Sequence, residues 1–353
     1  MASVASITAE PYNIPLLGTL KWGKGHQLAY LNHVLVTVTL SDGSVGQAEA
    51  TPRPSIYGET QASILHIAQE HLAPLLATHT LKTRADVDDL DVILHHIKGN
   101  QTAKGALNIA LHHAVAQSAG QTLAECLGVK TDSTEVSYIV STGSLEAVLA
   151  DVDSIYQQGV RVFKVKIGMD IPQEIATIRQ LIATFPKAKF YVDANQCLTI
   201  DNAPSVLNQL YEMGVLYCEE PLPVHQVHER QHLRQQTAMP IITDDSCFTV
   251  GDVQRELALD TFDIVNIKTA RTGFSQSALI AKLAREHDKQ VMVGSQASSL
   301  MGCQHAALFA MSVDSECATE ATFYLKTNSH QARPQIDDGQ LRLDALVKNV
   351  HLS

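Results

Sequence analysis

Five charged residues recur at nearly even intervals in the second half of the chain. Each follows a short apolar run, the intervals are 27, 26, 25 and 24 residues, and the residues are Lys166, Asp193, Glu219, Asp244 and Lys268. A β-strand with its crossover helix needs about this length. Repeated units of this kind give parallel strands whose carboxyl ends meet on one face, where a β/α barrel carries its chemistry. The spacing therefore predicts one site with three carboxylates and two or three lysines.

The three carboxylates predict a metal site. Asp193, Glu219 and Asp244 would repel one another in one cavity unless a cation neutralised them. A hard divalent ion with oxygen ligands does this and keeps positions open for a substrate. We therefore expect Mg²⁺, with Mn²⁺ as a substitute. The alternative is that one or two of the carboxylates cap the following helix or face solvent.

The lysines predict acid–base chemistry. Lys164 and Lys166 lie two residues apart on one expected strand, so they share a face. Clustered cations and burial should lower the pKa of a lysine there, so that it can act as a base. Lys268 comes from a strand across the barrel, and a base on each side of one carbon suits a 1,1-proton transfer. The alternative is that Lys164 and Lys166 only form salt bridges with the acidic cluster, which leaves Lys268 unexplained.

The elements that position these residues form two blocks. Between residues 8 and 50, an alternating apolar run and the turn Ser41-Asp42-Gly43-Ser44 predict antiparallel strands, and helical spacing follows to about residue 128. Strands followed by helices indicate a separate α+β domain. From residue 135 strands and helices alternate, and we expect barrel strands at 136–140, 160–167, 189–193, 216–219, 240–244, 264–268, 290–295 and 316–320.

The composition excludes several classes of protein. The 353 residues are 45% hydrophobic and 18% charged, which is typical of a globular protein. A net charge of −11 argues against a nucleic-acid partner. No apolar run is long enough to span a membrane, residues 1–6 lack the features of a signal peptide, and the six cysteines lack disulfide spacing. We expect a cytoplasmic enzyme that acts on a small carboxylate and has no membrane partner.

Five motifs, in their order and spacing, resemble those of the enolase superfamily in its muconate-lactonizing-enzyme subgroup. They are Lys164-Val165-Lys166, Asp193-Ala194-Asn195-Gln196, Glu219-Glu220-Pro221, Thr243-Asp244-Asp245-Ser246 and Asn266-Ile267-Lys268. The resemblance covers essentially the whole chain. It implies an α/β fold: a modified TIM barrel, (β/α)7β, at 131–327, with an α+β capping domain at 1–130 that the C-terminal segment 328–353 completes.

The resemblance also implies roles for the charged residues. Asp193, Glu219 and Asp244 would be the metal ligands, Lys166 and Lys268 the acid/base pair, and Lys164 an electrostatic helper. Asn195 and Asp245 would support these groups from behind. The implied reaction is abstraction of a proton alpha to a carboxylate, through an enediolate.

Within the subgroup the chain resembles the dipeptide epimerases most. The segments 50–60 and 291–295 are similar to theirs, and Ser141 falls where those enzymes place a substrate-contacting serine. Their eighth strand carries an Asp-x-Asp that holds the dipeptide's ammonium, whereas this chain has Ala318-Thr319-Glu320. The expected substrate-binding residues are Ser141, Ser295, Glu320, Lys21, Lys24 and Arg53. The three cations predict an anionic distal group on the substrate, unless they are ordinary surface cations.

The predicted function is a two-lysine racemase or epimerase that acts on a dipeptide or an amino-acid derivative. One alternative is a lyase or cycloisomerase with the same site, of the o-succinylbenzoate synthase, muconate cycloisomerase or hydroxy-amino-acid dehydratase type, which needs one essential proton-transfer lysine. Another is a binding protein on an inactive barrel, which a complete set of carboxylates and lysines argues against. Family analogy suggests a homo-oligomer.

Overall fold

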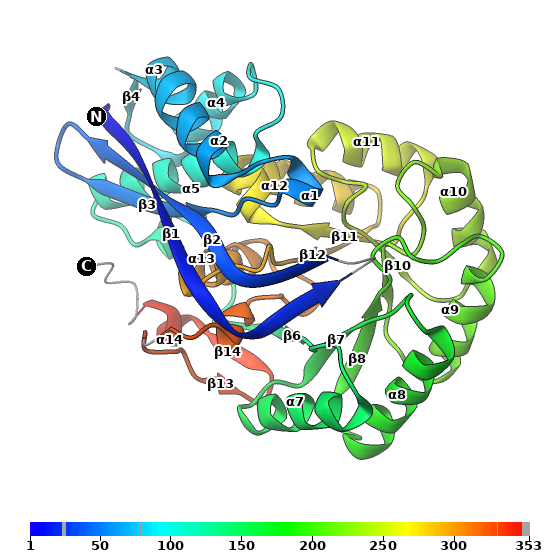
Figure 1. The fold of residues 1–353 in the computed structure, drawn as a ribbon. Coiled ribbons are helices and arrows are strands. Elements are labelled where there is room, and N and C mark those ends of the chain that lie inside the picture. Colours follow the sequence, from blue (N-terminus) through cyan, green and yellow to red (C-terminus); the bar gives the residue numbers. More distant parts are fainter. Residues whose placement is uncertain (23–25, 78, 330, 348–353) are drawn as a thin grey trace.

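The structure, a computed structural model, describes the chain except residues 23–25, 78, 330 and 348–353. Figure 1 shows an antiparallel sheet and helices at the N-terminal end, beside a ring of strands and helices formed by the rest of the chain. No helix in the described ranges is long and apolar enough to cross a membrane.

The N-terminal sheet is antiparallel and has the strand order β3-β2-β1-β4. The predicted hairpin is confirmed, because Gly43 N donates to Leu40 O at 3.0 Å between the second and third strands. The far ends of the first two strands extend over the barrel (Figure 1). The strands are β1 (Ala2–Trp22), β2 (His26–Leu40), β3 (Val45–Ala50) and β4 (Thr80–Leu81).

Helices follow the sheet, as the sequence predicted. The longest of them, Gln101–Ser118, is buried along most of its length because it packs between β3 and a helix of the barrel. The helices are α1 (Pro54–Tyr57), α2 (Gln61–His66), the π-helical turn η1 (Ile67–Leu72), α3 (Ala73–Leu76), α4 (Arg84–Leu94), α5 (Gln101–Ser118) and α6 (Leu123–Leu127).

Seven parallel strands form the barrel sheet, in the order β12-β11-β10-β9-β8-β7-β6. The expected eighth strand closes the ring through backbone hydrogen bonds on both sides: Cys317 N and Glu320 N donate to Val291 O and Val293 O at 3.3 and 2.9 Å, and on the other side Ser137 N donates to Thr319 O at 2.9 Å and Thr319 N to Glu135 O at 2.7 Å. The predicted fold class is therefore confirmed. The strands are β6 (Ser137–Ile139), β7 (Val162–Lys166), β8 (Lys189–Asp193), β9 (Cys218–Glu219), β10 (Ile241–Thr243), β11 (Ile264–Ile267) and β12 (Gln290–Val293).

Helices cover the outside of the barrel (Figure 1). They alternate with the strands, as expected for parallel strands joined by crossover connections. They are α7 (Leu145–Gln157), α8 (Ile171–Thr184), α9 (Ala203–Glu212), α10 (Val227–Gln236), α11 (Val250–Leu259), α12 (Thr269–Glu286), α13 (Leu300–Val313) and the short 3₁₀ helix η2 (Phe323–Lys326).

The C-terminal segment contacts both parts of the molecule. Asn328 N donates to Pro15 O of β1 at 2.9 Å. The hairpin of β13 (Ile336–Asp337) and β14 (Gln340–Arg342) instead pairs with β5 (Ser133–Glu135), directly before the barrel, and α14 (Leu343–Val347) follows. The hairpin thus joins a sheet other than the capping sheet, and the division of the chain into two domains stays a prediction.

The contact between α5 and α12 requires a residue without a side chain. A Cβ at Gly105 would lie 2.7 Å from Ala270 O. We expect Gly105→Ala to lower the free energy of unfolding by about 1–3 kcal/mol, because overpacking outweighs the higher helix propensity of alanine. Gly251→Ala in α11, where a Cβ would lie 3.8 Å from Thr249 Oγ1, should be neutral or stabilising. Urea unfolding of both variants measures this, and equal effects would contradict it.

Candidate active site

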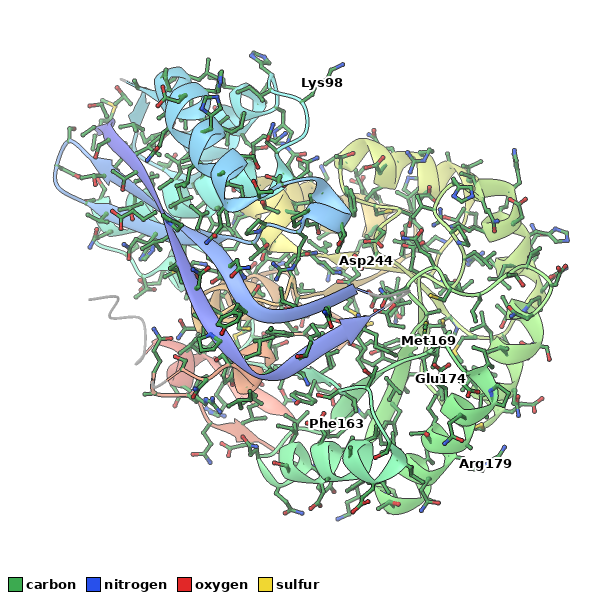
Figure 2. All side chains as sticks on the ribbon, in the orientation of Figure 1. Lys98, Phe163, Met169, Glu174, Arg179 and Asp244 are labelled. Carbon is green, nitrogen blue, oxygen red and sulfur yellow. The ribbon has the colours of Figure 1, made fainter. Side chains whose placement is uncertain are left out.

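Neighbouring barrel strands bring the five spaced residues together. In register, Lys166 of β7 lies beside Asp193 of β8, which lies beside Glu219 of β9. Asp244 follows β10, and Lys268 follows β11, the next strand of the sheet. The two lysines therefore flank a row of three carboxylates (Asp244 is labelled in Figure 2). This is the arrangement that the spacing predicted.

Lys164 is the central cation of this row. It is 2% exposed, and its Nζ lies 2.9 Å from Asp193 Oδ2, 2.8 Å from Glu219 Oε2 and 2.7 Å from Glu320 Oε1. Glu320 comes from the eighth segment, which lies beyond β6 and so two positions from β7 around the closed ring. One ammonium thus joins carboxylates from three positions around the barrel.

The two flanking lysines each contact a different carboxylate. Lys166 Nζ lies 2.6 Å from Asp193 Oδ2 and 2.7 Å from Asn195 Oδ1. Lys268 Nζ lies 2.5 Å from Asp244 Oδ2. The salt bridges that were the alternative for Lys164 and Lys166 are therefore present, and they include Lys268 as well.

The expectation of a lowered pKa in the Lys164–Lys166 pair is wrong for Lys164, and the pKa of Lys268 is not lowered either. Burial alone would lower the pKa of Lys268, but Asp244 and Glu219 outweigh it and raise that pKa above its ordinary value. The pKa of Lys164 is raised in the same way. Burial would raise the pKa of Asp193, but Lys164 and Lys166 bring it down to about 2. Opposite charges at hydrogen-bond distance control the ionisation of these groups.

The oxygens of the row suit a hard divalent cation. Carboxylate oxygens are the ligands that Mg²⁺ prefers. Within the described residues, Glu219 Oε1 is buried without a hydrogen-bond partner, so it retains a free acceptor. The same residues contain no group of three acidic, histidine or cysteine side chains already arranged around a metal position, and the ammonium groups of Lys164 and Lys268 lie against Asp193 and Asp244. The carboxylate oxygens therefore suit such an ion, which would compete with the lysine ammonium groups for them.

Two further charged residues, which the sequence analysis did not single out, hold the Asp244 loop. Arg271 of α12 donates to Asp244 Oδ1 at 3.0 Å and to the backbone oxygen of Cys247 at 3.1 Å. Glu220 accepts from Asp244 N at 2.7 Å and from Ser246 N at 3.1 Å. Burial raises the pKa of Glu220 to about 7. Glu220 directly follows β9, which was a usable signal, whereas Arg271 lies in the first turn of α12, four residues after β11 ends.

The two residues expected to support the site take different positions. The side-chain oxygen of Asn195 accepts a hydrogen bond from Lys166 Nζ, and the backbone N–H of Asn195 donates to Asp193 Oδ1 at 2.8 Å. Asp245 accepts from Gln196 Nε2 at 2.8 Å and lines the cavity. Asn195 thus holds a carboxylate and a lysine together, whereas Asp245 faces the space beside them.

A cavity of about 340 Å³ opens at the lysines and carboxylates. Its polar wall comes from the ends of the barrel strands. Its apolar wall combines the capping part, the first barrel strand and the 3₁₀ helix, through Leu20, Leu28, Ile56, Ile139 and Phe323. The capping part therefore supplies part of the surface that a substrate meets.

Three expected substrate-binding residues line this cavity, but two of them already form several hydrogen bonds within the protein. Arg53 is 5% exposed, and it donates to Pro52 O at 2.6 Å and also to the backbone oxygen of Gln296. Glu320 accepts from Tyr191 Oη at 3.0 Å and from Ser295 N at 2.7 Å, besides its contact with the central lysine. The third residue, Ser295, lies at the same wall.

The other expected substrate-binding residues are Ser141, Lys21 and Lys24. Ser141 follows β6 and is not among the residues that line the cavity; its hydroxyl accepts from Lys326 Nζ at 2.7 Å. The backbone of Lys21 pairs with Gln27. Lys24 lies outside the described residues.

Family models match both parts of the chain. The "Mandelate racemase / muconate lactonizing enzyme, N-terminal domain" matches residues 26–128, and the "Enolase C-terminal domain-like" model matches residues 147–346. The chain therefore belongs to the mandelate racemase/muconate lactonizing enzyme family, within the enolase superfamily, as its motifs predicted.

Individual relatives are epimerases. An L-Ala-D/L-Glu epimerase of Bacillus subtilis is 31% identical over 284 residues, which cover 79% of this chain and 77% of that protein. A D-Ala-D/L-Ala epimerase of Cytophaga hutchinsonii is 29% identical over 287 residues, covering 80% and 77%. A substrate-liganded structure of the Bacillus subtilis L-Ala-D/L-Glu epimerase matches with a TM-score of 0.89 at 27% identity, over 96% of each chain. The chain is thus an enzyme of this family, similar to its isomerases.

Arg271 should be essential for the shape of the site. We expect Arg271→Lys to lower the free energy of unfolding by at least about 2 kcal/mol, because lysine lacks the planar fork that reaches several buried oxygens. Arg342→Lys is the matched control, since its pair with Asp344 is more than half exposed. Thermal and urea unfolding of both variants test this, and an Arg271→Lys variant as stable as its control would contradict it.

Proposed function

We propose that this chain catalyses a 1,1-proton transfer at the carbon alpha to a substrate carboxylate, as a racemase or epimerase. One observation carries the proposal: Lys166 and Lys268 lie on the two strands that flank the carboxylate row, and each reaches a different end of it. A carbon held above the row would have one amine on each side. Inversion of a stereocentre needs this arrangement, because the proton leaves one face and returns to the other.

In this proposal the two lysines exchange roles with the direction of reaction. One takes the alpha proton on its Nζ, the electron pair moves into the carboxylate as an enediolate, and the other lysine donates a proton to the opposite face. The alpha proton of a carboxylate is a very weak acid, so fixed positive charge must stabilise the enediolate. Lys164, buried and held between three carboxylates, supplies such a charge and has little freedom to move.

Asp193, Glu219 and Asp244 would hold Mg²⁺, or Mn²⁺ in its place. When bound, the ion supplies two further positive charges next to the developing enediolate. Its charge beside Asp193 and Asp244 would also weaken the attraction that keeps Lys166 and Lys268 protonated, which favours their action as bases. The free acceptor on Glu219 Oε1 supports this assignment.

The substrate is proposed to be a dipeptide or another amino-acid derivative with a free carboxylate. The names of the two epimerase relatives support this class. A cytoplasmic location and a homo-oligomeric state stay predictions.

A lyase or cycloisomerase is the second candidate. The matched N-terminal family model bears the name of a lactonizing enzyme as well as that of a racemase. Both chemistries begin with a carboxylate substrate in the same site, but elimination or ring closure needs only one of the two lysines as a proton-transfer group.

The lysine pair gives the first test. We expect Lys166→Ala and Lys268→Ala each to reduce interconversion of stereoisomers by about 10²–10⁴-fold or more, because each removes one of two required proton carriers. Any remaining exchange with D₂O should be confined to one stereoisomer, and to the opposite one in the two variants. Both variants should still bind Mg²⁺ in calorimetry. Lys189→Ala, at the other end of β8 and half-exposed, is the control. Full interconversion of stereoisomers by either variant would show that the two-lysine scheme is wrong.

Metal dependence gives the second test. Proton NMR in D₂O should show loss of the alpha-proton signal from members of a panel of L,L- and L,D-dipeptides and N-acyl amino acids. EDTA should abolish this exchange and added Mg²⁺ should restore it, because the enediolate needs the extra charge. Exchange that persists after complete metal removal would exclude the role assigned to the carboxylate row.

A further inference from the structure

The helix that follows Lys268 is interrupted after its first turn. Within α12, Gly273 has φ 61° and ψ −172°, a backbone conformation that glycine alone adopts readily, so the long part of the helix starts at Phe274. The turn before it, residues 269–272, is bonded to the backbone of Lys268, whose oxygen accepts from Arg271 N at 2.9 Å. This turn therefore connects one proposed base to the start of the long helix.

A residue of the capping part caps the start of this helix. The first N–H groups of a helix need acceptors, and the side chain at the N-cap position commonly supplies one. Gly273, at that position, has no side chain. Instead, Asn108 of α5 accepts through its Oδ1 from Phe274 N at 2.8 Å and from Ser275 N at 3.2 Å. The cap of a barrel helix thus comes from the other part of the molecule.

The side chain of Asn108 is itself held on all sides. It is 1% exposed, and its Nδ2 donates to Asp91 Oδ1 of α4 at 3.0 Å and to Ser275 Oγ at 2.8 Å. With two hydrogen bonds accepted and two donated, the amide group uses its ordinary capacity. A buried polar group with all of its partners makes its surroundings rigid. Asn108 therefore fixes the start of the long helix relative to two helices of the capping part.

The packing around the cap is close. Figure 1 shows α5 beside α12, and the two helices contact each other. A Cβ at Gly105, one helical turn before Asn108, would lie 2.7 Å from Ala270 O, and a Cβ at Gly273 would lie 2.6 Å from Asn108 Oδ1. The turn at residues 269–272 is therefore in contact with α5 at both of its ends.

The loop after Lys166, the other proposed base, is held from within the barrel. Glu174 of α8 accepts from Gly168 N at 2.7 Å and from Met169 N at 3.0 Å (Glu174 and Met169 are labelled in Figure 2). The backbone that follows each lysine is thus fixed by a different part of the molecule: the capping part for Lys268, and a barrel helix for Lys166.

We propose that Asn108 is a positioning residue for Lys268: by capping the helix at Phe274 it holds the preceding turn, and with it the backbone from which the Lys268 side chain reaches the carboxylate row. The inference rests on the proposed function for the role of Lys268 as a proton carrier. A displacement of about 1 Å can cost about a hundredfold in rate, so a cap remote from the substrate can affect one base selectively. The alternative is that Asn108 only joins the two parts of the molecule.

Backgrounds with one proposed base each separate these readings. In Lys166→Ala the alpha proton exchanges with D₂O at Lys268, and in Lys268→Ala it exchanges at Lys166. The probes are L-Ala-L-Glu and L-Ala-D-Glu with the Mg²⁺-loaded enzyme, and proton NMR follows the alpha-proton signal of the glutamate unit. We expect added Asn108→Ala to slow exchange about tenfold to a hundredfold in the first background. In the second, the effect should stay within about threefold, as for independent sites.

Matched variants assign the effect to the cap. Glu174→Ala should show the reverse pattern, because Glu174 holds the other loop. Asn108→Asp combined with Asp91→Asn keeps an acceptor at the helix start and a hydrogen bond between the two side chains, so it should restore most of the exchange. Asn208→Ala removes an acceptor of Ala238 N at the start of β10 and should alter neither background. Asn108→Ser, a smaller change, repeats the test if the alanine variant does not fold.

Amide hydrogen exchange tests the cap without any substrate. Asn108→Ala removes the acceptor of Phe274 N and Ser275 N, so mass spectrometry should show exchange about tenfold faster or more in residues 269–275. Exchange in residues 168–174, which Glu174 holds, should stay unchanged.

Two outcomes would overturn the inference: equal slowing of alpha-proton exchange in both single-lysine backgrounds, or unchanged amide exchange in residues 269–275. If the unaltered enzyme exchanged the alpha proton of no dipeptide or N-acyl amino acid, while amide exchange rose as expected, the proposed function would fail and the capping of the turn after Lys268 by Asn108 would stand.

Discussion

The structure depends on one charge-balanced contact, the ammonium of Lys164 between Asp193, Glu219 and Glu320. Three buried carboxylates cannot share a cavity without a cation, and a buried ammonium cannot exist there without them. Because these four residues come from β7, β8, β9 and the eighth segment, their charges balance only when the barrel is closed. Folding and the assembly of the site are thus one event, and no single strand carries the site by itself.

Groups outside the cavity fix the shape of this row. Arg271 and Glu220 bind the backbone of the loop after β10 and thereby hold Asp244. The capping part likewise holds a loop of the barrel, the one between β12 and α13. Glu49 of β3 accepts from Ser299 N at 2.9 Å and from Tyr12 Oη at 2.7 Å, so the loop between β12 and α13 is bound to the N-terminal sheet. A buried polar group that is fully hydrogen-bonded rigidifies its surroundings.

The charged groups of the site and the apolar wall of the cavity come from different parts of the fold. The proposed proton-transfer lysines and the carboxylates come from the ends of the barrel strands, where parallel pairing sets their register. The apolar wall of the cavity comes from β1, β2, α1, β6 and η2. The charged and the apolar surfaces that a substrate would meet therefore belong to different elements.

The sequence by itself determined the barrel, the row and its flanking lysines. A strand and its crossover helix have nearly constant length, so residues spaced by 24 to 27 positions must reach the same edge of the sheet. Even the eighth segment, which pairs with its neighbours through only a few backbone hydrogen bonds, was expected in its place. Only the tertiary structure decided the ionisation of Lys268, the engagement of Arg53 with backbone oxygens, and the meeting of Lys326 with Ser141. These depend on distances between residues far apart in the chain, and local spacing contains no information about such distances.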